Sequence, residues 1–200
     1  DEDICMRRDL TPLAALSEYF EVRPVLFMRR QDCWLESWYR QQVKWQWDGR
    51  YAKLSFQDFL TRRRDFFWID YDRLAGSLAD LFGRGSLILI PFEEGTGATD
   101  SVSLFYDLLG VRDLPRSTRE ANNQSFSAPM TEFLRGLPLA QLPPDQRRKV
   151  ERACAQVDVA IKDQSSFFTE AASREAILTE FRASNRRVAQ TYFGRDDLFQ

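Results

Sequence analysis

The sequence contains no histidine among its 200 residues. That absence excludes Ser-His-Asp and Cys-His catalytic groups, the HExxH zinc motif and any acid–base chemistry that depends on imidazole. A general base in this chain must therefore be a carboxylate, lysine, tyrosine or cysteine side chain.

Cysteine is also scarce. The three cysteines, Cys5, Cys33 and Cys154, are widely spaced and odd in number, and no metal-ligand spacing accompanies them. We therefore expect no metal site, no disulfide framework, and a reducing, cytoplasmic compartment.

Long apolar segments are missing as well. No apolar run is long enough to cross a bilayer, and the first residues do not resemble a signal peptide, so we expect no membrane span. The sequence starts at Asp1 without a methionine. This start suggests an expressed fragment, a processed product or one piece of a longer protein, whose other domains would then be partners.

The composition is that of an ordered globular protein, with 44% hydrophobic and 14% aromatic residues. The formal charge of −2 carries no nucleic-acid signature, and we expect no nucleic-acid partner. Residues 29–64 nevertheless hold nine Lys or Arg against four Asp or Glu. Lys44, Arg50 and the arginines at 62–64 could attract an anionic cofactor or a polysaccharide, or they could form an ordinary solvated face.

Two apolar runs predict buried strands, at Val25–Met28 and Ser86–Phe92. Helices are predicted over residues 11–20, 33–45, 71–82 and 99–109. This order favours an α/β layer of parallel strands flanked by helices. A doubly wound domain has roughly five or six strands, so part of the sheet is expected upstream of Asp1 or on another chain.

Local signals predict several helix ends. Thr11 and Pro12 suit an N-cap and a first helical residue, and Ser55 with Asp58 fits a capping box. Gly83 and Gly85 should end the helix before them.

We expect a single domain over residues 1–200, with an α/β part at 1–110, a loop at 111–128 and a helix-rich part at 129–200. In the last part, Asp145 is predicted to cap one helix and Ser173 to open a longer one.

The end of the first predicted strand carries two candidate phosphate-binding residues. Arg29 lies at the end of the strand, and Ser37 falls eight residues later, in the second turn of the next helix. An arginine at the carboxyl end of a strand, followed by a helix start, is typical of phosphate sites in α/β proteins. The other interpretation is an ion pair of Arg29 with Asp32 or Glu36, beside an exposed helix serine.

Four blocks of sequence, in the same order, resemble bacterial sulfotransferase-like proteins. The first is Met28-Arg-Arg-Gln-Asp-Cys-Trp-Leu-Glu-Ser-Trp-Tyr-Arg-Gln-Gln-Val-Lys44. The others are Ser55-Phe-Gln-Asp-Phe-Leu60, then Asp70-Tyr-Asp-Arg-Leu74 through Phe82-Gly83 to Ile90-Pro-Phe-Glu-Glu94, and finally Phe181-Arg-Ala-Ser-Asn-Arg-Arg-Val-Ala-Gln-Thr-Tyr-Phe193. The resemblance implies a sulfotransferase fold, a P-loop-NTPase-like parallel sheet flanked by helices.

In that family, the arginine and the serine of the first block bind the 3′-phosphate of 3′-phosphoadenosine 5′-phosphosulfate (PAPS), an anionic nucleotide cofactor. The resemblance therefore assigns this role to Arg29 and Ser37. It leaves open whether Arg30 assists, because successive strand residues face opposite sides of a sheet.

The chain departs from the family in one respect. Sulfotransferases carry a P-loop-like segment of Gly, Lys, Thr and Ser after their first strand, which wraps the 5′-phosphosulfate and supplies a catalytic cation. No such segment precedes residue 23. Gly83-Arg-Gly85-Ser86 precedes a strand and is interpreted as a helix stop, whereas Gly95-Thr-Gly97 follows a strand but lacks the lysine and the spacing.

Two further groups allow two interpretations each. Glu93 and Glu94 follow the second predicted strand, where a carboxylate could act as a general base, or could simply cap a helix or pair with a cation. Trp34, Trp38, Trp45 and Trp47 could form an aromatic wall for a sugar or adenine ring, or could pack in the core.

The sequence thus predicts a sulfotransferase-like domain that transfers a sulfuryl group from PAPS to a hydroxyl of a carbohydrate or related small-molecule acceptor. The missing P-loop also allows a non-catalytic binding or interaction module of a larger polysaccharide-assembly protein. A nucleotide-binding, kinase-like relative is a third alternative.

Overall fold

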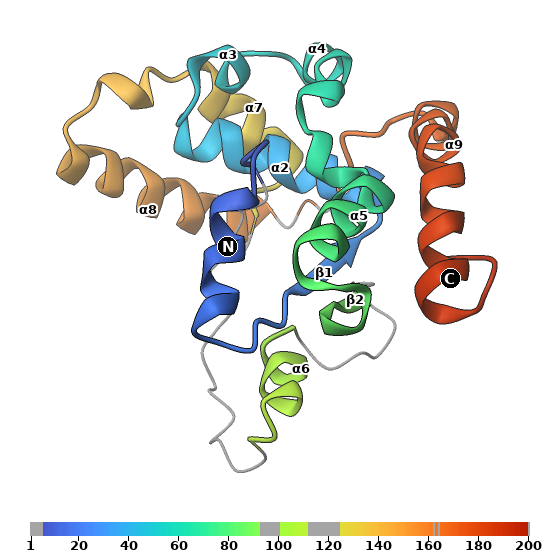
Figure 1. Ribbon diagram of the computed structural model, residues 1–200. Helices are drawn as coiled ribbons and strands as arrows, with labels where there is room; N and C mark the ends of the chain where they lie inside the picture. Colours follow the sequence, from blue (N-terminus) through green and yellow to red (C-terminus); the bar gives the residue numbers. More distant parts are fainter. Residues whose placement is uncertain (1–5, 93–100, 112–124, 162, 164, 200) are drawn as a thin grey trace. The chain divides into compact units, whose positions relative to one another are not determined.

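The computed structural model describes residues 6–92, 101–111, 125–161, 163 and 165–199. The chain divides into two compact units (Figure 1). Unit 1 comprises Asp1–Gln31, Asp65–Ser117 and Glu175–Gln200, and unit 2 comprises Asp32–Arg64 and Thr118–Arg174.

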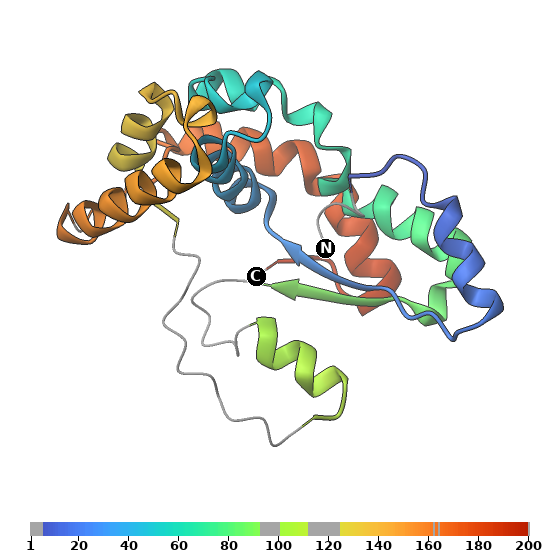
Figure 2. The same cartoon turned by 90° about the vertical axis from the view of Figure 1, so that its left-hand side faces the viewer.

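Unit 1 contains a two-stranded parallel sheet. Strand β1 (Val25–Arg29) pairs with β2 (Ile88–Phe92), with Val25 opposite Ile88 and Arg29 opposite Phe92. The two arrows point the same way in Figure 2. The predicted parallel pairing is confirmed, and β2 begins later than expected because Arg84–Ser86 forms a 3-10 turn, η4.

The expected complete burial of both strands is wrong. Within β1 and β2, Met28 alone is fully buried, and every residue of β2 is half-buried. Leu26, Met28 and Leu89 contact apolar clusters of unit 1. In the described residues each strand pairs on one side alone, so neither has the neighbours on both edges that a central strand has.

Helix α5 (Tyr71–Phe82) confirms the predicted helix over 71–82. The Asp70 side chain caps it by accepting the N–H of Arg73, and its inner face buries Tyr71, Leu74, Ala75 and Leu78. The helix ends at Gly83, whose φ of 82° is a left-handed value that favours glycine. The interpretation of this glycine as a helix stop is therefore confirmed.

The N-terminal helix η1 (Thr11–Glu18) is a 3-10 helix, and its N-cap is Leu10, not the predicted Thr11. Thr11 is the first residue of η1, and its N–H donates to the Asp9 carboxylate at 2.9 Å. Leu16 and Phe20 are 45% and 67% exposed.

Two more helices belong wholly or mostly to unit 1. Helix α6 (Ser101–Leu108) buries none of its residues, and Gly110 follows it with a φ of 71°. The predicted start of this helix, at residue 99, lies outside the described residues. Helix α9 (Ala171–Val188) begins before the predicted Ser173 and continues into a π-helical turn, η6 (Ala189–Phe193), whose Ala189 packs near Met28.

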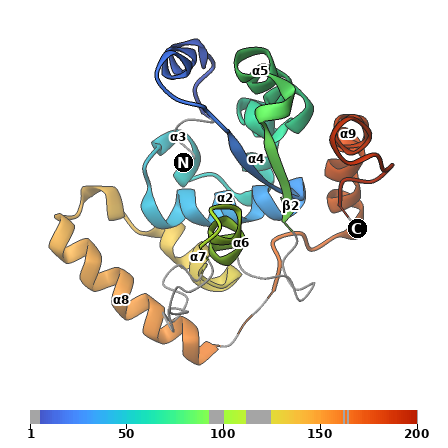
Figure 3. The same cartoon turned by 60° about the horizontal axis from the view of Figure 1, so that its bottom comes forward.

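Unit 2 is helical. It contains α2 (Gln31–Trp45), α3 (Gly49–Ala52), α4 (Phe56–Thr61), α7 (Ala128–Gly136) and α8 (Pro144–Ile161); α7 and α8 can be followed in Figure 3. Tyr39 lies in an aromatic core, with ring centroids 5.2 Å from Phe56, 5.3 Å from Phe59 and 5.0 Å from Phe167.

Some predicted helix ends of unit 2 are confirmed and others are wrong. Ser55 is confirmed as the N-cap of α4, because its Oγ accepts the Asp58 N–H at 3.1 Å. The Asp58 carboxylate accepts from the Ser55 hydroxyl at 2.7 Å, whereas a capping box has it accept the Ser55 backbone N–H. Helix α2 begins at Gln31, two residues before the predicted Cys33. Asp145 is not a cap, since Pro144 already opens α8 and places Asp145 in the first turn.

Helices predominate in the described residues, and the helix-rich C-terminal part is confirmed by α7, α8 and α9. Most of the predicted loop at 111–128 lies outside the described residues, and α7 begins at Ala128 after the Ser127 cap. Within the described ranges, no helix combines the length and apolarity needed to span a membrane.

Candidate functional site

A single tyrosine holds the carboxyl end of β1. The buried Tyr71 hydroxyl accepts the backbone N–H of Arg29 at 3.0 Å and donates to the Arg29 carbonyl at 2.5 Å. The backbone is therefore fixed at the residue for which the sequence predicts phosphate binding. The Arg29 side chain itself is half-buried, as is that of Arg30.

A reciprocal amide pair lies directly after this strand. Gln31 is fully buried, and its Nε2 donates to Asn185 Oδ1 at 2.8 Å and to the Ile69 carbonyl at 3.1 Å. Asn185 Nδ2 donates back to Gln31 Oε1 at 2.9 Å. Because a buried amide costs free energy unless its groups are hydrogen-bonded, this pairing specifies how α9 meets the end of β1.

The start of α5 is joined to α9 by a second polar group. Ser184 Oγ donates to Asp70 Oδ1 and accepts the N–H of Asp72 at 3.3 Å. Arg187 Nε donates to Asp72 Oδ2 at 2.6 Å. Asp70 and Asp72 lie at the start of α5, where the helix dipole stabilises carboxylates. Their bonds to Ser184 and Arg187 join α5 to α9.

These contacts gather three of the four blocks that carry the family resemblance. Arg29 and Gln31 belong to the first block, Tyr71 to the third, and Ser184 and Asn185 to the last. The blocks meet although Gln31 and Asn185 are 154 positions apart. Their polar groups bond to one another, so in unit 1 these residues form a scaffold around the end of β1.

The two acidic residues that follow Arg29 make ion pairs within unit 2. The fully buried Asp32 accepts from Arg174 Nη1 at 2.9 Å. Glu36 pairs with Arg40 at 2.7 Å. The alternative interpretation, in which Arg29 pairs with Asp32 or Glu36, stays a prediction.

Hydrogen bonds also surround the Glu36 carboxylate. It accepts from the Ser166 hydroxyl at 2.8 Å and from the Phe167 N–H at 2.9 Å. Burial alone would raise the pKa of Glu36, but the bonds from Arg40, Phe167 and Ser166 outweigh it and lower the pKa. These contacts favour the ionised form of Glu36 and give its carboxylate a structural role in unit 2.

The other predicted site residues fall in different places. Ser37 is half-buried in α2 and belongs to unit 2, whereas Arg29 belongs to unit 1. Their joint binding of one phosphate therefore stays a prediction. Glu93, Glu94 and the Gly95-Thr-Gly97 segment lie outside the described residues.

The tryptophans of unit 2 divide between the core and the surface. Trp34 and Trp38 stack with ring centroids 5.3 Å apart, and Trp38 is buried. Trp45 and Trp47 stack at 5.8 Å with nearly parallel planes, and Trp47 is 61% exposed. Packing accounts for Trp38, while Trp47 presents an open indole surface.

The turn between Trp45 and Trp47 is set by Gln46. This residue has a φ of 46°, a left-handed value that is uncommon outside glycine. Its buried side chain donates to the carbonyls of Leu134 and Leu137 and accepts the Ala140 N–H at 3.1 Å. Three hydrogen bonds thus stabilise the strained backbone that ends α2.

The basic residues at 44–64 have mostly structural contacts. Lys44 Nζ lies 4.9 Å from the Trp45 ring centroid, and Arg50 pairs with Asp48 at 2.6 Å. Arg63 donates to the Leu60 carbonyl at 2.9 Å. Arg62 and Arg64 are exposed.

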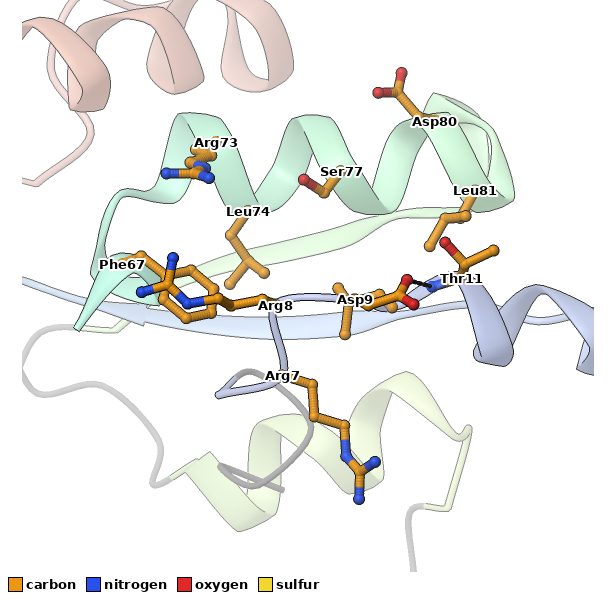
Figure 4. A pocket seen from close by; sticks show the side chains of 11 residues that line it. Arg7, Arg8, Asp9, Thr11, Phe67, Arg73, Leu74, Ser77, Asp80 and Leu81 are labelled. Atoms are coloured by element: carbon orange, nitrogen blue, oxygen red, sulfur yellow. Dashed lines mark hydrogen bonds between the residues drawn. The ribbon is translucent and has the colours of Figure 1, made fainter. Parts of the chain in front are cut away.

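A pocket of about 280 Å³ lies elsewhere in unit 1, between α5 and the segment that precedes η1 (Figure 4). Its lining includes Arg7, Arg8, Phe67, Arg73 and Leu74. Sequence reasoning missed this pocket. The available signal was the Arg7-Arg8 pair, placed just before an expected helix and outside every recognised motif.

No group of three or more His, Cys, Asp or Glu residues that could hold a metal ion occurs within the described part of the chain. Cys154 is a free cysteine, and burial is the main cause that raises the pKa of its thiol. A buried thiol with a raised pKa is a poor nucleophile.

Comparison with known proteins gives one distant relative. A protein of Archaeoglobus fulgidus, described as an uncharacterized protein, is 27% identical over 179 residues, which cover 88% of this chain and 47% of the relative. The chain thus spans about half the length of that relative. No protein-family model matches the chain, and no solved structure matches it.

Proposed function

We propose that this chain is a sulfotransferase-like domain that binds PAPS and transfers its sulfuryl group to a hydroxyl of a carbohydrate or related acceptor. The observation that carries the proposal is the position of Arg29 at the carboxyl end of a strand in a parallel pair, directly before the start of α2. Phosphate groups are commonly bound at this place in α/β proteins.

The scaffold around β1 supports the proposal. Binding sites need backbones held in place before the ligand arrives, and Tyr71 holds the Arg29 backbone through both of its polar groups. The Gln31–Asn185 pair fixes the residue that opens α2. The guanidinium group of an arginine matches two oxygens of a phosphate.

Ser37 comes to the proposal from the family resemblance, which leaves open whether Arg30 assists. In the proposed reaction the acceptor oxygen attacks the sulfur in line, the bond from sulfur to the departing 5′-phosphate breaks, and the acceptor proton passes to a base. Glu93 and Glu94 are the proposed candidates for that base. The free Cys154 is compatible with the reducing, cytoplasmic compartment that we propose.

Calorimetric titration with 3′,5′-adenosine bisphosphate tests the 3′-phosphate site. We expect Arg29→Ala to weaken binding by about 1.5–3 kcal/mol, the contribution of a hydrogen bond to a charged group, and Ser37→Ala by about 1 kcal/mol. Arg23→Ala is a matched control, because Arg23 is exposed and pairs with Glu21 ahead of β1. Failure of the parent to bind, or undiminished binding by both site variants, would contradict the proposal.

A non-catalytic module is the second candidate function. It is favoured by the absence of a P-loop-like segment before residue 23, because sulfuryl transfer needs cations that neutralise the developing charge. Incubation with radiolabelled PAPS and hydroxylated saccharides distinguishes the two functions. Label on a saccharide supports the enzyme, whereas nucleotide binding without transfer supports the module.

A further inference from the structure

The pocket in unit 1 gathers positive charge at one end. The guanidinium carbon of Arg8 lies 5.1 Å from the ring centroid of Phe67, and that of Arg73 lies 5.9 Å from the same centroid. Figure 4 shows both side chains near Phe67, while Arg7 is directed away from the ring. Two like charges are thus held beside one aromatic ring.

Within the described residues, no carboxylate forms an ion pair with Arg8 or Arg73. Asp9 and Asp80 also line the pocket. The Asp9 carboxylate accepts the Thr11 N–H, and hydrogen bonds from Thr11 lower its pKa. The Asp80 carboxylate lies at the end of the pocket far from Phe67 in Figure 4. Both acids lie toward that end, so among the described lining residues neither acid neutralises Arg8 or Arg73.

Three leucines give the pocket an apolar wall. Leu10 and Leu74 are buried and belong to one apolar cluster, and Leu81 packs against that cluster. A ligand that fills the pocket therefore needs an anionic group at the Phe67 end and an apolar body over the leucines. A phosphate monoester carries a charge of about −1.5 to −2 at neutral pH, which matches two guanidinium groups.

We propose that this pocket binds a small phosphate monoester with an apolar or aromatic body, its phosphate held by Arg8 and Arg73 and its body lying over Leu10 and Leu74. The site is separate from the proposed PAPS site, since Arg29 is not among the lining residues. The pocket therefore supplies a second ligand site, beyond the proposed function.

Calorimetry with phenyl phosphate tests this site. We expect the parent to bind it, Arg8→Gln and Arg73→Gln each to raise the Kd about tenfold or more, and added NaCl to weaken binding. Arg84→Gln is the matched control, because Arg84 is an exposed arginine of unit 1 that lies over the Tyr192 ring outside the pocket. Its Kd should equal that of the parent.

Neutral and weaker anionic probes test the ligand class. Benzyl alcohol should not bind detectably, and benzoate should bind less tightly than phenyl phosphate because it carries one charge. Thermal unfolding of each variant checks the fold. Because Arg8 and Arg73 are exposed, their substitution should leave the Tm unchanged.

Several results would overturn the proposal. One is absence of phenyl phosphate binding by the parent, and another is equal binding of benzyl alcohol. Loss of binding in Arg29→Ala, with Arg8→Gln and Arg73→Gln unaffected, would place the ligand at the proposed PAPS site instead. Failure of adenosine bisphosphate to bind would contradict the proposed function alone.

Discussion

At the scale of single residues, Asp32 is a fully buried carboxylate whose partner Arg174 is 32% exposed. Removal of one partner from a buried pair leaves a poorly compensated charge in the protein interior. We expect Arg174→Gln to lower the free energy of unfolding by about 3 kcal/mol, measured by urea denaturation.

The exposed pair of Arg182 with Glu175 offers a control for this prediction, because both side chains are more than half exposed. Such pairs contribute about 0–1 kcal/mol, so Arg182→Gln should change stability little. A double-mutant cycle of Asp32→Asn with Arg174→Gln should show a coupling of about 1 kcal/mol or more. Equal losses for the two arginines, or no coupling, would refute the role given to the pair.

Tyr71 is a second residue with a measurable contribution. Its hydroxyl bonds both the N–H and the carbonyl of Arg29, so Tyr71→Phe should cost about 1–2 kcal/mol of unfolding free energy. Tyr19→Phe is the control, because Tyr19 is 77% exposed, and its stability should match the parent. Tyr71→Phe should also weaken adenosine bisphosphate binding if Tyr71 positions Arg29.

At the scale of elements, α5 contains Gly76 and is capped by Gly83, and we expect opposite effects of alanine at these two positions. A Cβ added at either Gly76 or Gly83 would meet no atom within 4 Å, but Gly83 has a φ of 82°. We expect Gly83→Ala to destabilise by about 1 kcal/mol, and Gly76→Ala to stabilise by about 0.5–1 kcal/mol. Thermal unfolding of the two variants measures both changes in stability. If both variants are less stable than the parent, the positive φ of Gly83 does not decide the outcome.

The same element shows what local sequence can predict. Apolar spacing, the Asp70 cap and Gly83 all act within α5, so its bounds follow from the sequence. The start of α2 was misplaced because Gln31 pairs with Asn185, a contact that no local pattern encodes. The burial of β2 was overestimated because it depends on how many strands flank it.

At the scale of the whole molecule, the absence of histidine governs the pH response. No side chain with an ordinary pKa near neutrality can titrate, so unfolding free energy should stay nearly constant between about pH 6 and 8. Glu36 has a lowered pKa, so its stabilisation is present above the unfolded pKa near 4.3 and is lost as the pH falls below it.

Tyr39 contributes to the dependence of the unfolding free energy on alkaline pH. Burial, together with the hydrogen bond to Glu132 and the charge of that residue, raises the pKa of Tyr39 above its ordinary value. Its stabilisation is present below pH about 10 and is lost as the pH rises further. Urea denaturation from pH 2 to 11 should show the unfolding free energy falling at both acid and alkaline pH. The fall at acid pH should be smaller in Glu36→Gln, and the fall at alkaline pH should be smaller in Tyr39→Phe.

Whole-molecule organisation limits what the sequence can say about the sites. Arg29, Tyr71 and Asn185 belong to three of the four blocks, and the structure brings them into one hydrogen-bonded region. The pocket escaped notice because Arg8, Phe67 and Arg73 come from segments about sixty residues apart and become neighbours only on folding. Chemistry assembled from distant segments leaves no contiguous motif.

The Gln31–Asn185 pair also has a consequence for homologous sequences. Each amide supplies both a donor and an acceptor to the other, so a change at one position is tolerated only with a compensating change at the other. Among homologous sequences, positions 31 and 185 should therefore covary, even in lineages where Arg29 or Ser37 has been replaced. Such lineages would have kept the architecture after losing the ligand, and this one pair of positions would trace them.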